Sequence, residues 1–328
     1  MAFPRVASFK SHSDFMEHLA SLGLELPSDE VLETGEHSPL AAPLPRPGGQ
    51  IGNRFCILPM EGWDGTRDGK PTDLTRRRWH HFGISGAKLI WGGEAVAIRQ
   101  DGRANPNQLL ISEANLAEIE SLRADLVKRH LAEFGRDDDL LVGLQLTHSG
   151  RYARPNDKAR AAPRTAQRNS VLDRRLGIKD DSAMLSDDDL LQLIDDFVDA
   201  ARRAEKAGFA FIDIKHCHGY LGHELLSGMD RPGRFGGSFE NRTRFLREIV
   251  AGVKASAPTL QMAMRVSIFD FLPFCPGHEG VGEPEPGADA RLTFGGDGSG
   301  QGIDLSEPSK LMSLLKELGI GMVCTTAG

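Results

Sequence analysis

The sequence predicts an α/β protein: a (βα)8 TIM barrel, incomplete in this chain, which carries six of the eight βα strands. Strand-like and helix-like segments alternate strictly, which indicates a parallel sheet. Connections from strand to helix are long, those from helix to strand are mostly short, and polar residues end the strands, as at the functional face of a barrel. No GxGxxG motif follows a strand, which disfavours the doubly wound dinucleotide-binding fold.

The predicted strands are short apolar runs bounded by polar or glycine-containing segments. They cover residues 55–60, 86–92, 140–146, 209–214, 260–267 and 320–326. Six strands do not close an eight-stranded barrel. Either the chain lacks the last two βα units, or the barrel assignment is wrong.

The predicted helices carry apolar residues at helical spacing. They cover residues 72–83, 112–135, 187–207, 238–256 and 307–319. Ser112 is expected to cap the second helix, and Ser186 with Asp189 has the pattern of a capping box. Residues 1–50 have too little apolar periodicity for a core, so we expect them to brace the N-terminal face of a barrel domain at 51–328.

Composition indicates an ordinary globular protein, with 40% apolar residues, 26% charged residues and a net charge of −7. The acidic balance disfavours nucleic acid or an anionic membrane as a partner and leaves a small-molecule substrate. No secretory h-region and no apolar run of membrane-spanning length is present, so we expect a cytoplasmic location; the oligomeric state is not predicted. The four cysteines form no CxxC, which predicts reduced thiols and no cysteine-based metal site.

The segment IKHCHGY, at the end of the fourth strand, concentrates proton-exchanging side chains. The period of two places Asp213 and Lys215 on the inward face, where they either pair with each other or face a wet functional cavity. His216 and His218 have the spacing of a metal-binding His-x-His, but no further cluster of ligand residues completes such a site. Tyr220 carries a phenol that is a proton donor at neutral pH.

Two other strands end in polar side chains of interest. Alternation along LQLTHSGR places Gln145 on the face opposite its leucine neighbours, towards the barrel mouth. Arg265, deep in an apolar strand, needs an anionic or carbonyl partner, either a bound ligand or a structural carboxylate. The segment RFGGSFENRTRF (234–245) is interpreted as scaffolding at a helix start.

In their order and spacing, these segments resemble the Old Yellow Enzyme family of NADH:flavin oxidoreductases, with its 2,4-dienoyl-CoA reductase-like branch. The resemblance rests on NRFCILPM (53–60), QLTHSGR (145–151), HGYL (218–221), GGSFENRTRF (236–245) and RVSIFD (265–270). It covers the chain from about residue 50 onward. It implies an FMN-binding (βα)8 barrel, in agreement with the asymmetry of the loops.

The resemblance also implies roles for individual residues. The expected cofactor-contacting residues are Pro59, Met60, Glu61, Glu94, Gln145 and Arg265. Gln145 would bind the pyrimidine edge of the isoalloxazine, and Arg265 would lie near N1 and O2, where negative charge collects on reduction. The expected catalytic residues are Tyr220 as proton donor, with Lys215 and His218 as the substrate-anchoring pair.

The chain departs from the family pattern in three respects. Lys215 stands where many members have a histidine or another ligand, and its point charge favours a carboxylated or otherwise anionic substrate. Glu61 stands near the flavin where many relatives have a small polar residue or cysteine, and it disfavours reduced flavin unless it is paired, for example with Lys215. The family's phosphate-binding loops follow strands seven and eight, which are not among the six predicted strands.

We therefore predict an FMN-dependent oxidoreductase that uses NADH or NADPH to reduce an alkene conjugated to a carbonyl or carboxylate, by hydride transfer from flavin N5. Residues 152–179 carry eight Lys or Arg against two Asp, which indicates either a lid for an anionic ligand, through Arg160, Arg164 and Arg168, or a solvated loop. The alternatives are flavin-dependent oxidation or demethylation of an amine or ether, a histidine-based metal-dependent barrel hydrolase, and a non-catalytic fragment.

Overall fold

The computed structural model describes residues 4–46 and 48–327, except for the side chain of Glu279. The chain divides into two compact units, Met1–Arg54 and Phe55–Gly328. This boundary lies close to the one expected at residue 50.

The first unit has little regular structure. Helix α1 (His12–Ser21) begins after Ser11, whose hydroxyl accepts a hydrogen bond from the Asp14 N–H. Strands β1 (Leu44–Arg46) and β2 (Gly49–Ile51) form an antiparallel pair. α1 buries only Leu19 among its described residues, in agreement with the weak apolar pattern of this region. Its bracing role stays a prediction.

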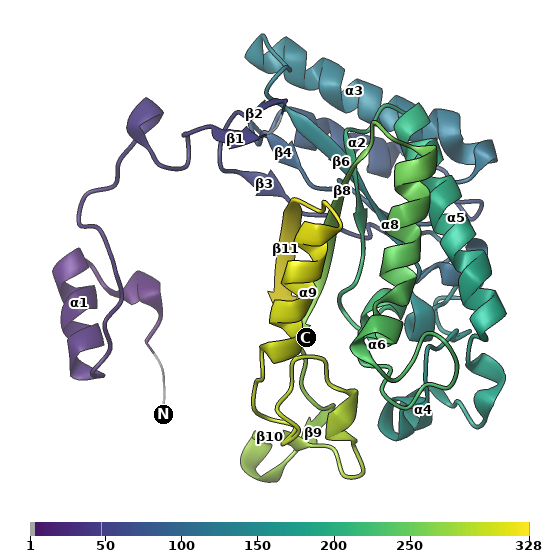
Figure 1. The fold of residues 1–328 in the computed structure, drawn as a ribbon. Helices are drawn as coiled ribbons and strands as arrows, with labels where there is room; N and C mark the ends of the chain where they lie inside the picture. Colours follow the sequence, from purple (N-terminus) through teal and green to yellow (C-terminus); the bar gives the residue numbers. More distant parts are fainter. Residues whose placement is uncertain (1–3, 47, 328) are drawn as a thin grey trace. The chain divides into compact units, whose positions relative to one another are not determined.

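The second unit is built on a parallel half-barrel sheet with the hydrogen-bonded order β11-β8-β7-β6-β4-β3, and β5 pairs with β6 (Figure 1). Its strands are β3 (Cys56–Ile57), β4 (Leu89–Ile90), β5 (Ala95–Ala97), β6 (Leu141–Thr147), β7 (Phe211–Ile214), β8 (Gln261–Phe269) and β11 (Met322–Ala327). All six predicted strands are confirmed, although the first two are shorter than expected. The strand β5 was not predicted.

Helices follow the strands and cover one face of the sheet. They are α2 (Asp73–Gly83), α3 (Leu116–Phe134), α4 (Ser170–Leu176), α5 (Asp187–Lys206), α6 (Leu221–Leu226), α7 (Phe239–Arg242), α8 (Arg244–Ser256) and α9 (Ser306–Glu317). α2 packs against α3, and α5 against α8 (Figure 1). Ile212 and Ile214 of β7 are fully buried in this helix-facing core, which turns Asp213 and Lys215 to the other face, as predicted.

Local chemistry accounts for where the helices differ from expectation. The capping box of Ser186 and Asp189 is confirmed, whereas Ser112 makes no side-chain cap because a 3-10 turn (Glu113–Asn115) precedes α3. The helix predicted over 238–256 breaks at Thr243, whose hydroxyl donates back to the Phe239 carbonyl at 2.8 Å. The long loop after β8 carries a hairpin of β9 (Phe274–Pro276) and β10 (Gly282–Pro284).

Candidate active site

The carboxyl ends of the parallel strands bring the predicted residues to one edge of the sheet. Gln145 on β6 lies in register with Asp213 on β7, which in turn lies in register with Ala263 on β8. Lys215 lies two residues after Asp213, and Arg265 lies two residues after Ala263. The side chains of Lys215 and Arg265 are therefore on the same face of the sheet as Asp213 and Gln145. The strand ends therefore form one polar edge, as expected for the functional face of a barrel.

Asp213 is the buried centre of this edge. Its carboxylate accepts hydrogen bonds from Trp91 Nε1 at 2.7 Å, Gln145 Nε2 at 2.5 Å and the Arg265 N–H at 2.6 Å. Burial raises the pKa of Asp213, and these three donors oppose the rise. Asp213 therefore does not pair with Lys215, one of the two arrangements that the sequence left open. The hydrogen bond from Gln145 Nε2 to Asp213 fixes the orientation of the amide, and this leaves the amide oxygen as the acceptor for a ligand.

Glu61 instead holds Lys215, in a group we call the Glu61 cluster: Glu61, Trp63, Lys215 and Tyr220. The Glu61 carboxylate accepts from Lys215 Nζ at 3.1 Å, from the Tyr220 hydroxyl at 2.8 Å and from Trp63 Nε1 at 3.1 Å. Lys215 Nζ lies 3.7 Å from the centre of the Tyr220 ring. The negative charge near the flavin position, a concern from the sequence, is thus balanced by Lys215.

The protonation states follow from these neighbours. Burial and the adjacent Glu61 carboxylate raise the pKa of Tyr220, so it remains a phenol. His218 has left-handed backbone geometry, with φ of 60°, and its N–H donates to Ser267 Oγ at 3.1 Å. Partial desolvation of its ring, together with the charges of Lys215 and Arg265, lowers the pKa of His218 to about 4. Its imidazole is therefore neutral at pH 7.

Glu94 fastens the loop that carries Glu61. Its buried carboxylate accepts from the Gly62 N–H at 2.7 Å and forms an ion pair with Arg78, which also binds Asp64. Burial raises the pKa of Glu94 to about 7 against the lowering effect of Arg78. Because both carboxylate oxygens are occupied within the chain, Glu94 acts on the site through the loop it holds. Trp63, with φ of 50°, lies in that loop.

Three other predicted cofactor contacts differ in their exposure. Pro59 is buried beside Gly92, whereas Met60 is 64% exposed and its carbonyl is bonded to the Ala95 N–H. Arg265 is half-buried on β8, and its Nε is buried without a hydrogen-bond partner. It forms no ion pair within the described part of the chain. A structural carboxylate, one of the two partners considered for Arg265, is therefore not found among the described residues.

A cavity of about 640 Å³ opens beside the Glu61 cluster. Its lining residues are Trp63, Ala104, Asn105, Tyr152, Arg154, Lys158, His218 and Tyr220. The sequence reasoning missed Trp63 and Tyr152, although composition held a signal: the chain has only two tyrosines, and both line this cavity.

His216 and two of the three arginines considered for a lid have partners elsewhere in the chain. His216 is buried, with Nδ1 3.1 Å from the Ile214 carbonyl, and its ring lies against Gly222 of α6. No group of three or more metal-ligating side chains occurs among the described residues. In the basic segment, Arg168 pairs with Asp173 and Asp181, and Arg164 lies 3.6 Å from an oxygen of Asp101.

The chain belongs to the NADH:flavin oxidoreductase / NADH oxidase family, whose sequence model matches residues 42–278, more than half of the chain. This confirms the Old Yellow Enzyme resemblance. The family consists of flavin oxidoreductases that use FMN with NADH or NADPH. An NADH:flavin oxidoreductase of Gibberella zeae is 29% identical over 74% of this chain and 60% of its own length. An NADPH dehydrogenase of Clostridium acetobutylicum is 31% identical over 67% of this chain and 61% of its own length.

Solved structures agree on the fold. A 2-naphthoyl-CoA reductase complex superposes with a TM-score of 0.65 over 88% of this chain and 40% of its own, at 17% identity. Morphinone reductase in complex with tetrahydroNAD superposes with a TM-score of 0.61 over 87% of this chain and 73% of its own, at 20% identity. The chain spans about 60% of the length of the curated relatives it matches. No helix among the described residues is long and apolar enough to cross a membrane.

The residues present fit the ring system of FMN. The unpartnered Nε of Arg265 and the oxygen of the Gln145 amide offer one donor and one acceptor at the same edge. Exposed Met60 supplies an apolar surface at the adjoining strand end. These three residues would hold the isoalloxazine.

Proposed function

We propose that the chain is the catalytic part of an FMN-dependent oxidoreductase that takes electrons from NADH or NADPH and reduces a carbonyl-conjugated alkene in a small molecule. The observation that carries the proposal is the Glu61 cluster, in which Glu61 holds Lys215 and Tyr220, and Tyr220 lines the cavity together with His218. When bound, FMN supplies hydride transfer at its N5. The chain supplies orientation, hydrogen-bond donors and a proton.

The charge balance of the cluster supports a neutral reacting group. Because Glu61 neutralises Lys215, the ion pair adds no net charge to the cavity, and a carbonyl oxygen is served by hydrogen bonds from Lys215 and His218. Arg154 and Lys158 line the same cavity and form no ion pair within the described chain. We therefore expect a substrate with an uncharged reacting end and an anionic distal part.

Tyr220 is proposed to protonate the carbon next to the one that receives hydride. Its raised pKa keeps the proton on the phenol. The hydrogen bond that the hydroxyl donates to Glu61 holds the hydroxyl in place until a bound substrate replaces that bond. Transfer of that proton leaves Tyr220 as a phenolate, which the ammonium of Lys215, 3.7 Å from the centre of the ring, would stabilise.

We also propose that the six strands are the first six of a complete (βα)8 barrel. β3 and β11 each pair on one side only among the described residues. Phe55, Leu58 and Met60 around β3 are exposed, although strand edges of this kind are normally covered.

Tyr220→Phe tests the catalytic proposal. In FMN-loaded protein, oxidation of reduced flavin by cyclohexenone should slow about 100-fold or more, whereas flavin reduction by NADPH or NADH should be nearly unchanged. Stopped-flow absorbance measures both half-reactions, and Tyr152→Phe in the same cavity is the matched control. Equal slowing of both half-reactions would refute the role of Tyr220. An amine or ether that bleaches oxidised flavin without NAD(P)H would favour the oxidative alternative.

A further inference from the structure

A second cavity of about 290 Å³ shares the lining residue Tyr152 with the first. Segments after β6, in α6 and after β8 contribute to its walls, including Gln167, His223 and Asp270. His218 and Tyr220 do not line it. The proposed catalytic chemistry therefore leaves this cavity unexplained.

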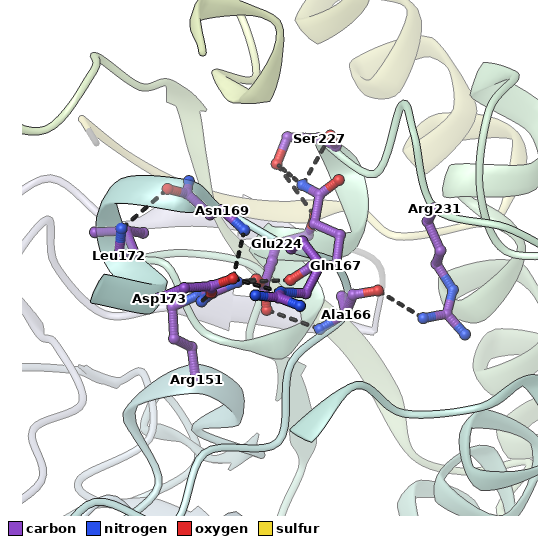
Figure 2. A network of polar contacts seen from close by, with 10 residues as sticks. Arg151, Ala166, Gln167, Asn169, Leu172, Asp173, Glu224, Ser227 and Arg231 are labelled. Atoms are coloured by element: carbon purple, nitrogen blue, oxygen red, sulfur yellow. Dashed lines mark hydrogen bonds and ion pairs between the residues drawn. The ribbon is translucent and has the colours of Figure 1, made fainter. Parts of the chain in front are cut away.

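The wall around Gln167 is held by a buried polar network (Figure 2). Arg151 is fully buried, forms ion pairs with Asp173 and Glu224, and donates to the Gln167 carbonyl at 2.7 Å. Glu224 also accepts from the Ala166 N–H at 2.9 Å, so the backbone is fixed on both sides of the Ala166–Gln167 peptide. The position of the Gln167 side chain is thereby set in advance of any ligand.

The Gln167 side chain leaves one hydrogen-bond acceptor unsatisfied. Its Nε2 donates to the Ser227 carbonyl at 3.0 Å, which fixes the orientation of the amide because a carbonyl only accepts (Figure 2). Its Oε1 is buried without a partner, in a residue that is 4% exposed. An acceptor left unpaired at such depth is rare in folded proteins, and a ligand N–H would satisfy it.

His223 supplies the complementary donor. Its Nδ1 accepts from the Gly219 N–H at 2.9 Å, so the proton of the neutral ring is on Nε2. The ring is 3% exposed, and Nε2 makes no hydrogen bond within the described chain. A ligand carbonyl in the cavity would accept this proton.

The charges of the wall disfavour an anionic ligand. The two lining arginines are balanced, Arg151 by Glu224 and Asp173, and Arg175 by Glu285. Asp270 remains, with one carboxylate oxygen on the Phe271 N–H at 2.9 Å and no cation paired to it in the described chain. It would repel an anion and accept a second N–H.

We propose that this cavity binds a primary carboxamide, which donates its N–H groups to Gln167 and Asp270 and accepts from His223 through its carbonyl. Leu172 and Phe271 add apolar wall for the carbon skeleton. The proposal does not depend on the proposed function, because it concerns residues outside the Glu61 cluster.

Benzamide is a suitable probe, with isosteric benzoate as the charged comparator. Calorimetric titration of the whole chain, with and without FMN, should show benzamide binding and at least about tenfold weaker binding of benzoate, whose carboxylate would meet Asp270 and offers no N–H to Gln167. Failure of FMN binding would leave this result intact, so the two proposals fail separately.

Variants locate the probe. Gln167→Met removes the acceptor and should weaken benzamide binding about 5- to 10-fold, whereas Gln192→Met, on the exposed face of α5, should not. Leu172→Trp fills the cavity without touching the polar network and should abolish binding. No benzamide binding to the folded protein, equal or tighter binding of benzoate, or loss of binding in Trp63→Ala with no effect of Leu172→Trp would each overturn the proposal.

Discussion

The Glu61–Lys215 ion pair makes a quantitative prediction. The two side chains are 9% and 6% exposed, and their Oε1 and Nζ atoms are 3.1 Å apart. Removing one member of a buried pair costs about 3–5 kcal/mol, because the other charge stays buried without its partner. Glutamine keeps the shape of Glu61 and still accepts from Tyr220, so we expect about 3 kcal/mol for Glu61→Gln. Lys215→Met should cost a similar amount.

Urea unfolding of both single variants and of the double variant measures the coupling. The double variant leaves no unpaired charge. Its loss in the free energy of unfolding should therefore be smaller than the summed losses of the two single variants, by at least about 1 kcal/mol. Glu118→Gln is the control, because its pair with Arg76 is more than one-third exposed and should contribute about 1 kcal/mol or less. Additive single effects, each below about 0.5 kcal/mol, would refute the buried pair.

Two further predictions concern pH. Burial raises the pKa of both tyrosines, so absorbance at the phenolate band should show no tyrosine ionising near pH 10 in the folded protein. Unfolding should expose both phenols to titration. A tyrosine that titrates at its ordinary pKa in the folded protein would contradict the packing. Burial also lowers the pKa of His216 and His223 to about 4 each, so the unfolded chain binds more protons between pH 4 and 6.5 and the free energy of unfolding falls as the pH falls through this window. His223→Gln should reduce that slope in unfolding titrations, and an unchanged slope would show that His223 is not buried as a neutral ring.

Apolar patterning was sufficient to predict the sheet. Runs such as 209–214 are buried on the helix side and bounded by turns, so their period and length predict parallel strands directly. The errors lie where a single hydrogen bond decides the backbone. Thr243 interrupts a helix through its own hydroxyl, and Ser112 loses its cap to a 3-10 turn. A continuous helix and a broken one have the same apolar pattern here, and so do a capped and an uncapped helix start, so the sequence could not distinguish them.

Strand alternation also predicted which side chains of the candidate site face inward, but not which of them pair. Asp213 and Lys215 are two residues apart and could have paired, yet Asp213 accepts from three neutral donors, which come from β6, from β8 and from Trp91 after β4. Lys215 reaches Glu61, 154 residues away in the chain. Trp91 was missed because its contribution depends on strand register, which periodicity does not specify.

Glu61 and Glu94, both predicted to contact the cofactor, have different partners in the structure. Glu94 has both oxygens engaged with Gly62 and Arg78, so it determines where the loop after β3 lies. Glu61, held at the start of that loop, reaches across the strand ends to Lys215 and Tyr220. The phenol and the ammonium on the segment after β7 are thus oriented by a carboxylate whose own position depends on a second, buried carboxylate. The position of the proposed proton donor therefore depends on an acid that has no free oxygen to offer a ligand.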